Sequence, residues 1–263
     1  MGNINQIILS ANEDPLYIDF WKPVSWAYKM MFPDVKVHLA FLTNRSEDDP
    51  YVQRLRESGT VTLFKPVENI PEFGQAKMIR FILASEQGDD VCYIDDIDLF
   101  PLVKSFITDK TDSRPQGQML CVGGEVYHNN GCYPVSQMTA EGWLWKKLIN
   151  PKNYEYAKLI NTFRNPPRFD KRENISIKLD WSKDMYFSDE RLIRRLRHEN
   201  PIPVFEMERG YKHYMDSTID RAKWEVDMEK LKAHGYFNAH GVRPFNDHKE
   251  KYEPLVKYIL ENY

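Results

Sequence analysis

Two patterns of apolar residues alternate along the first half of the chain. Short, uninterrupted runs rich in β-branched residues predict strands that are buried on both faces. Between them, apolar positions recur every three or four residues, which predicts helices that bury one side. The predicted strands span residues 6–11, 35–43, 60–67 and 91–94, and the predicted helices lie within residues 15–33, 48–59 and 74–88.

These repeated strand–helix–strand units indicate an α/β fold with a mostly parallel central sheet and helices on both faces. In such sheets, ligands bind beyond the carboxyl ends of the strands. Ser10 lies at the end of the first predicted strand, and Asp95, Asp96 and Asp98 directly follow the fourth. We therefore expect these residues at the ligand-binding edge of the sheet.

The second half of the chain is less regular. Residues 117–137 favour a strand and a loop, and residues 165–187 a long irregular connection. Predicted helices span residues 139–150, 188–200, 221–235 and 253–263. Ser188 can cap the second of these, Gly235 can end the third, and Pro254 suits the first turn of the last. No internal repeat or clear linker is visible, which predicts a single domain.

Composition narrows the possible functions. The chain has 263 residues, of which 42% are hydrophobic, enough to bury a large core. Its formal net charge of −3 and the lack of a long basic stripe argue against nucleic acid as the main partner. In the densest basic stretch, 191–199, Leu192, Ile193 and Leu196 mark one helical face, so the arginines are expected on the solvated face.

The cysteines and the N-terminus bear on the cellular compartment. Cys92, Cys121 and Cys132 are odd in number and lack C-x-x-C spacing, which favours a reducing compartment over a disulfide framework or a cysteine-rich zinc site. The N-terminus has only a short apolar run, and no stretch approaches the roughly 20 apolar residues of a membrane span. We expect a soluble, cytoplasmic protein without a transmembrane segment.

Residues 91–101, VCYIDDIDLFP, hold the main chemical signal. The predicted strand delivers Asp95, Asp96 and Asp98 within four positions, and apolar residues follow at once. Clustered carboxylates beside an apolar wall repel one another and lose hydration, so a positive partner is expected there. Carboxylates one residue apart at a strand end suit a hard divalent cation that also binds water and phosphate oxygens. An exposed acidic turn is the alternative.

With the helix before it, this stretch resembles the front half of the GT-A-fold glycosyltransferases, which use nucleotide-sugar donors. The likeness is strongest over residues 74–100. It implies a GT-A-like single domain over residues 1–263 with two abutting Rossmann-like halves, about 1–110 for the nucleotide sugar and about 111–263 for the acceptor. It also implies transfer of a hexose or pentose from a nucleoside-diphosphate sugar, with UDP-sugar favoured, to a hydroxyl of a glycan or another acceptor.

The same resemblance implies roles for residues of the donor site. Asp96-Ile97-Asp98 corresponds to the D-x-D motif, whose acids hold Mn²⁺ or Mg²⁺ against the donor diphosphate. Lys77 and Arg80 lie on the preceding helix, where the family carries a basic residue. Asp95 is an extra acid that by analogy contacts the nucleotide ribose or the metal. The segment Ser10-Ala11-Asn12 matches the place where such enzymes hold the base and ribose.

Residues 240–245, HGVRPF, are similar to a late motif of the retaining, glycogenin-like members. That motif supplies a histidine to the metal shell and a lysine to the diphosphate, so His240 is implied as a metal ligand and Arg243 as a diphosphate-binding residue. Arginine replaces lysine here, and the spacing is shorter. Imidazole still suits Mn²⁺, and a guanidinium grips phosphate in a bidentate fork. A histidine in a polar loop is the alternative for His240.

The stretch SDERLI, residues 188–193, resembles the family's later acidic motif near the reacting sugar. This implies catalytic roles for Asp189 and Glu190. In an inverting enzyme, one of these acids takes the proton of the acceptor hydroxyl. In a retaining enzyme the leaving phosphate accepts that proton, and the acid steadies the sugar. The alternative is structural, because acids in a first turn stabilise a helix through its dipole.

Other classes of protein remain open from the residues alone. A metal-dependent phosphohydrolase of the haloacid dehalogenase kind also uses D-x-D after a strand, usually near the N-terminus and followed by Thr or Val, whereas Leu99 follows here. Sugar nucleotidyltransferases share such a sheet, but their glycine-rich loop is absent from Ile7–Pro15. A non-catalytic sugar-binding module is a further possibility.

Overall fold

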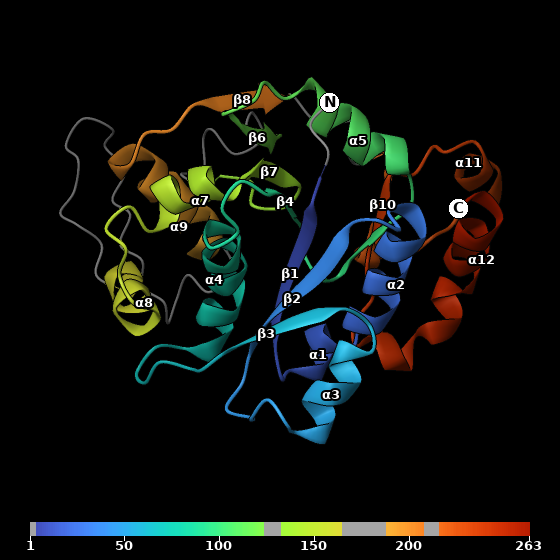
Figure 1. Cartoon of the computed structure of the whole chain (residues 1–263). Coiled ribbons are helices and arrows are strands. Elements are labelled where there is room, and N and C mark those ends of the chain that lie inside the picture. The colour runs from blue at the N-terminus through green and yellow to red at the C-terminus, as the bar shows by residue number, and fades with distance from the viewer. Residues whose placement is uncertain (1–3, 124–132, 165–187, 208–215) are drawn as a thin grey trace.

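A seven-stranded sheet runs through the centre of the molecule, in the order β3-β2-β1-β4-β7-β6-β8 (Figure 1). The computed structural model describes residues 4–123, 133–164, 188–207 and 216–263. The strands of the sheet are β1 (Gln6–Asn12), β2 (Lys36–Leu42), β3 (Thr60–Phe64), β4 (Val91–Ile94), β6 (Met119–Val122), β7 (Met138–Glu141) and β8 (Val204–Met207). Strands β1 to β4 pair in parallel, as do β6 and β8, whereas β7 is antiparallel to both of its neighbours. The predicted α/β class with a mostly parallel sheet is confirmed.

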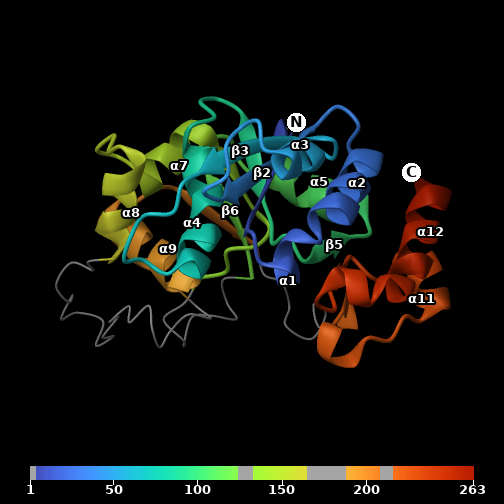
Figure 2. The same ribbon diagram turned by 90° about the horizontal axis from the view of Figure 1, so that it is seen from below.

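Helices cover both faces of this sheet, which explains the uninterrupted apolar strands (Figures 1 and 2). One layer contains α4 (Glu72–Ser85), α7 (Gly142–Ile149), α8 (Tyr156–Arg164) and α9 (Ser188–Glu199). The other contains α1 (Pro15–Ile18), α2 (Trp21–Met31), α3 (Pro50–Arg56), α5 (Lys104–Ser113), α11 (Met228–Lys232) and α12 (Glu253–Asn262). Ile7 and Leu9 pack into the α2 and α12 side, and Ile8 packs into the α4 and α7 side. All three are fully buried. Among the described helices, none has the length and apolar character needed to cross a membrane.

The helix predicted over residues 139–150 begins later than expected. Residues Met138–Glu141 form β7, which pairs with β4 so that Thr139 lies opposite Tyr93. The helix α7 starts only at Gly142, where a Cβ would lie 2.8 Å from backbone atoms of Gln87 and Gly88. Pairing between distant strands therefore overrides the local helical pattern.

The helix predicted over residues 221–235 is also wrong in its first part. The structure has a short 3₁₀ helix, η1 (Arg221–Lys223), and then α11, with extended residues between them. Asp220 accepts a hydrogen bond from the Ala222 backbone N–H, and Asp227 accepts from those at the start of α11. Each aspartate thus begins a separate element, because such side-chain bonds compete with a continuous helix.

A second, three-stranded sheet joins the C-terminal part of the chain to the D-x-D segment. Its order is β5 (Leu99–Pro101), β10 (Asn238–His240) and β9 (Thr218–Ile219). β10 runs antiparallel to β5 with His240 opposite Leu99, and parallel to β9. This pairing brings His240 next to Asp98. The irregular connection predicted over residues 165–187, and most of the loop predicted before residue 137, lie outside the described residues.

The turn after β10 depends on Gly241. Its backbone N–H donates a 2.7 Å hydrogen bond to the Asp98 carbonyl oxygen. A Cβ at this position would overlap the buried ring of Phe20 and lie 3.0 Å from the Tyr252 hydroxyl oxygen. We expect Gly241→Ala to lower the free energy of unfolding by about 1–3 kcal/mol, because the added methyl overpacks this contact. Thermal or urea denaturation measures the change, and unaltered stability would contradict the tight approach.

Candidate functional site

A pocket of about 160 Å³ lies at the carboxyl ends of β1 and β4. Residues from α1, α4, α9 and the segment that follows β10 also line it. The predicted site residues along its wall are Ser10, Ala11, Asn12, Lys77, Arg80, Asp96, Asp98, Asp189, Glu190, His240 and Arg243. The structure therefore brings together nearly all the residues that the sequence singled out, from positions more than 200 apart in the chain.

Arg80 connects the D-x-D segment to the start of α9. Its Nη1 lies 2.5 Å from Asp96 Oδ1 and donates to the Asp95 carbonyl oxygen at 2.9 Å. Its Nη2 lies 3.0 Å from Asp189 Oδ2. Burial disfavours the charge of Arg80, but the neighbouring Asp96 and Asp189 outweigh it, so the pKa of the guanidinium is raised. One buried cation thus sets the spacing of two acidic groups.

Asp189 and Glu190 differ sharply in their surroundings. Both oxygens of the buried Asp189 face cations, since Lys77 Nζ lies 3.4 Å from Oδ1 and Arg80 holds Oδ2. Glu190 lines the same pocket, and its buried Oε2 has no hydrogen-bond partner among the described residues. Burial, together with the charges of Asp189 and Asp96, raises the pKa of Glu190 to about 8. Asp189 is therefore held in place by two cations, whereas Glu190 can exchange a proton near neutral pH.

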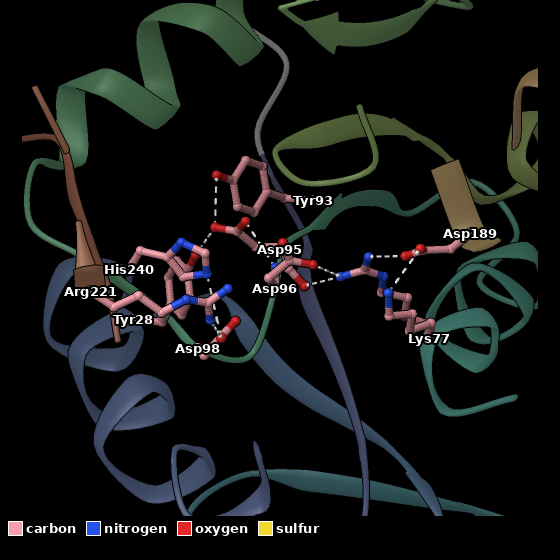
Figure 3. A network of polar contacts seen from close by, with 10 residues as sticks. Tyr28, Lys77, Tyr93, Asp95, Asp96, Asp98, Asp189, Arg221 and His240 are labelled. Carbon is pink, nitrogen blue, oxygen red and sulfur yellow. Dashed lines mark hydrogen bonds and ion pairs between the residues drawn. The ribbon is translucent and has the colours of Figure 1, made fainter. Parts of the chain in front are cut away.

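Asp98 lies at the other side of the site from Asp189 (Figure 3). Its Oδ2 accepts a hydrogen bond from Arg221 Nη1 at 3.0 Å and lies 3.5 Å from His240 Nε2. Arg243 Nε is 3.7 Å from the same oxygen. Burial alone would raise the pKa of Asp98, but His240 and the two guanidinium groups lower it below its usual value. Asp98 is therefore an ionised carboxylate.

Asp95 is not part of the pocket lining, and its side chain points toward Tyr93 (Figure 3). Its Oδ2 accepts from the Tyr28 hydroxyl at 2.7 Å and from the Tyr93 hydroxyl at 3.4 Å, and its Oδ1 accepts from the Asp96 backbone N–H. Burial and the nearby Asp96 raise the pKa of Asp95 to about 7. Contact of Asp95 with ribose or metal stays a prediction; in this structure its hydrogen bond with the Asp96 N–H orients the backbone that presents Asp96.

The donor atoms present fit a divalent cation. Asp96, Asp98 and His240 line one pocket, and carboxylate oxygens with an imidazole nitrogen are suitable ligands for Mn²⁺. Within the described parts of the chain, no three histidine, cysteine or acidic side chains are already gathered in the manner of a metal site. Asp96 is instead turned toward Arg80, and Asp98 toward Arg221.

Sequence reasoning missed part of the pocket wall. Tyr17 lies under the guanidinium of Arg243, with the Arg243 Cζ atom 4.7 Å from the ring centroid, and Phe73 contacts the Lys77 ammonium in the same way. Arg221 was expected only as part of a longer helix. No local pattern distinguishes it, because its approach to Asp98 depends on the pairing of β9 with β10.

Comparison with protein-family models gives no match. No curated protein matches the chain in sequence. Among solved structures, the apo-form glycosyltransferase GlyE of Streptococcus pneumoniae TIGR4 aligns with a TM-score of 0.51 and 11% identity over 98% of this chain and 63% of the GlyE chain. Another GlyE crystal structure gives a TM-score of 0.50 and 12% identity over the same shares.

The galactosyltransferase LgtC, in complex with donor and acceptor sugar analogs, aligns with a TM-score of 0.49 and 11% identity over 97% of this chain and 95% of that one. The chain spans less than two thirds of the length of GlyE, and at such low identity the likeness is one of fold. The mostly parallel sheet flanked by helices agrees with the fold class that the resemblance over residues 74–100 implied. The chain therefore has the GT-A-type fold found in the glycosyltransferase GlyE.

Proposed function

We propose that this protein is a metal-dependent glycosyltransferase that moves a hexose or pentose from a nucleoside-diphosphate sugar to a hydroxyl of a glycan or another acceptor. UDP-sugar is the favoured donor. The observation that carries the proposal is one pocket that holds the D-x-D acids and the Asp189–Glu190 pair, with Arg80 linking Asp96 to Asp189. The fold shared with GlyE supports the same class of reaction.

The donor is proposed to lie across the carboxyl ends of the strands. Ser10, Ala11 and Asn12 would hold the base and ribose, and Arg243 would bind the diphosphate in a bidentate fork. Lys77 and Arg80 line the pocket wall, and their N–H groups are proposed to contact phosphate oxygens or the sugar.

Asp96, Asp98 and His240 are the residues that would hold Mn²⁺ or Mg²⁺. A divalent cation bound there supplies Lewis-acid stabilisation of the negative charge that builds on the departing diphosphate. The guanidinium of Arg243 contributes to the same stabilisation, because it is fixed in a partly buried site before the reaction begins.

The two acids at the start of α9 are proposed to have different roles in the reaction. Asp189 is held on both oxygens by Lys77 and Arg80, which suits it to orient the donor sugar. Glu190 has a buried oxygen without a hydrogen-bond partner in the described parts of the chain, and its pKa is raised to about 8 by burial and its acidic neighbours. In an inverting reaction Glu190 would take the acceptor hydroxyl proton; in a retaining reaction it would steady the positively charged sugar.

The direct test is turnover of nucleotide sugars by the purified protein. UDP- and GDP-sugars are supplied with Mn²⁺ or with EDTA, and p-nitrophenyl phosphate serves as a general phosphatase substrate. We expect Mn²⁺-dependent release of nucleoside diphosphate and little phosphatase activity. Phosphatase activity alone would favour a phosphohydrolase. Sugar binding without turnover of any nucleotide sugar, with Mn²⁺ or with EDTA, would favour a binding module.

The diphosphate contact gives a separate prediction. We expect Arg243→Ala to weaken binding of UDP at least tenfold and binding of uridine much less, because a hydrogen bond to a charged group contributes about 1.5–3 kcal/mol. Isothermal titration calorimetry in Mn²⁺ buffer measures both affinities. Lys249→Ala, which removes an exposed cation near the same loop, is the matched control. Equal losses for UDP and uridine would mean that Arg243 does not contact the diphosphate.

A further inference from the structure

Three nitrogen atoms from the C-terminal part of the chain converge on one oxygen of Asp98. Arg221 Nη1 is nearest, at 3.0 Å, followed by His240 Nε2 at 3.5 Å and Arg243 Nε at 3.7 Å. Figure 3 shows the side chains of Arg221 and His240 meeting Asp98 from the same side. His240 and Arg243 belong to the motif discussed above, whereas Arg221 comes from a separate segment that no sequence pattern assigned to the site.

The backbone around Arg221 holds it in a defined position. Arg221 follows β9 closely and begins η1, whose start is fixed by the 2.7 Å bond from the Ala222 N–H to Asp220. Ile219, at the end of β9, is buried in the core, and β9 pairs with the strand that carries His240. The side chain of Arg221 is 23% exposed and lines the pocket. It is a part of the pocket wall.

The charges at this end of the pocket do not cancel. The single carboxylate of Asp98 faces the guanidinium groups of both Arg221 and Arg243. The cations at the other end, Lys77 and Arg80, are already paired with Asp96 and Asp189. Among the residues that the structure describes, positive charge is therefore in excess beside Asp98, in a partly buried place where solvent screens it weakly. Such a site favours a ligand with more than one negative charge.

We infer that Arg221 is a second arginine for the donor diphosphate, acting beside Arg243; this rests on the function proposed above. Guanidinium has five N–H donors, and the contact with Asp98 uses its Nη1 end. The guanidinium can therefore stay bound to Asp98 while it binds a phosphate oxygen. It can also release Asp98 and bind the phosphate oxygen instead. Two arginines on neighbouring phosphate oxygens would fix the diphosphate more firmly than Arg243 alone.

Binding of inorganic pyrophosphate tests this role without requiring the correct base or sugar. Calorimetry in Mn²⁺ buffer compares wild-type protein with Arg221→Gln, Arg221→Lys and Lys223→Gln, the last being an exposed cation of the same 3₁₀ helix. We expect Arg221→Gln to bind pyrophosphate at least tenfold more weakly. Arg221→Lys should recover part of this loss because it keeps the charge, and Lys223→Gln should bind like wild type.

The outcomes separate this inference from the proposed function. Uridine binding by the same variants shows whether the pocket is intact, and it should be unchanged. If Arg221→Gln binds pyrophosphate as tightly as wild type, Arg221 serves only as a partner of Asp98 and the inference is overturned. If wild-type protein binds neither pyrophosphate nor UDP in the presence of Mn²⁺, the proposed function fails and this inference fails with it.

Discussion

Asp96→Asn is expected to reduce metal-dependent sugar transfer by roughly 10²–10⁴-fold while the protein stays folded. The loss corresponds to the several kcal/mol of transition-state stabilisation that a catalytic metal supplies. The amide keeps the shape of the side chain and one acceptor oxygen for Arg80. Arg80 also retains Asp189 and the Asp95 carbonyl oxygen, so the buried guanidinium is not left unpaired.

The measurement is the rate of transfer across a range of Mn²⁺ concentrations, with melting temperature recorded on the same preparations. Asp89→Asn makes the same chemical change at an exposed position shortly before β4 begins. This variant should behave like wild type. Asp98→Asn is a less specific probe, because it also removes the counter-charge of Arg221 and Arg243. Transfer at the wild-type rate in Asp96→Asn would remove the D-x-D acids from the proposed mechanism.

Glu190→Gln is expected to have a comparably large effect on chemistry and little effect on donor binding. Removal of a general base typically costs roughly 10²–10⁴-fold in rate. UDP affinity should barely change, since the phosphate and metal contacts are proposed at Asp96, Asp98 and Arg243. Single-turnover transfer and UDP titration on the same protein distinguish the two quantities. Glu199→Gln, at the far end of α9, is the matched control.

The pH dependence gives this prediction a second measurement. Because burial and acidic neighbours raise the pKa of Glu190 to about 8, the base form accumulates as pH rises through that value. If Glu190 is the base, transfer by wild-type protein should increase over this range, and the increase should disappear in Glu190→Gln. A full rate in Glu190→Gln at every pH would limit Glu190 to a structural role at the helix start.

The same shift predicts how stability changes with pH. The pKa of Glu190 is higher in the folded protein than its ordinary value of 4.5, so the folded state binds the proton more tightly than the unfolded state. The contribution is fully present below about pH 4.5 and is lost as pH rises through about 8. Glu190→Gln should therefore lose less stability than wild type between these values, as measured by melting temperature.

Much of the fold was set by local sequence. The apolar run Ile7-Ile8-Leu9 is fully buried between two helical layers, as its lack of alternation predicted. Asp96 and Asp98 closely follow the end of β4, as the short apolar run Val91–Ile94 predicted. Resemblance to the GT-A fold then indicated Asp189 and His240, and both lie in the pocket. Their catalytic and metal-binding roles, and the division of the chain near residue 110, stay predictions.

Only the tertiary structure decided which distant groups meet. Met138–Glu141 forms a strand because it pairs with β4, although its local pattern favoured a helix. Asp95 accepts a hydrogen bond from Tyr28, a partner 67 positions away that the neighbouring sequence cannot specify. Arg221 reaches Asp98 through the pairing of β9, β10 and β5. Apolar periodicity and capping act over a few residues, whereas strand partners and ion pairs are fixed by packing across the whole chain.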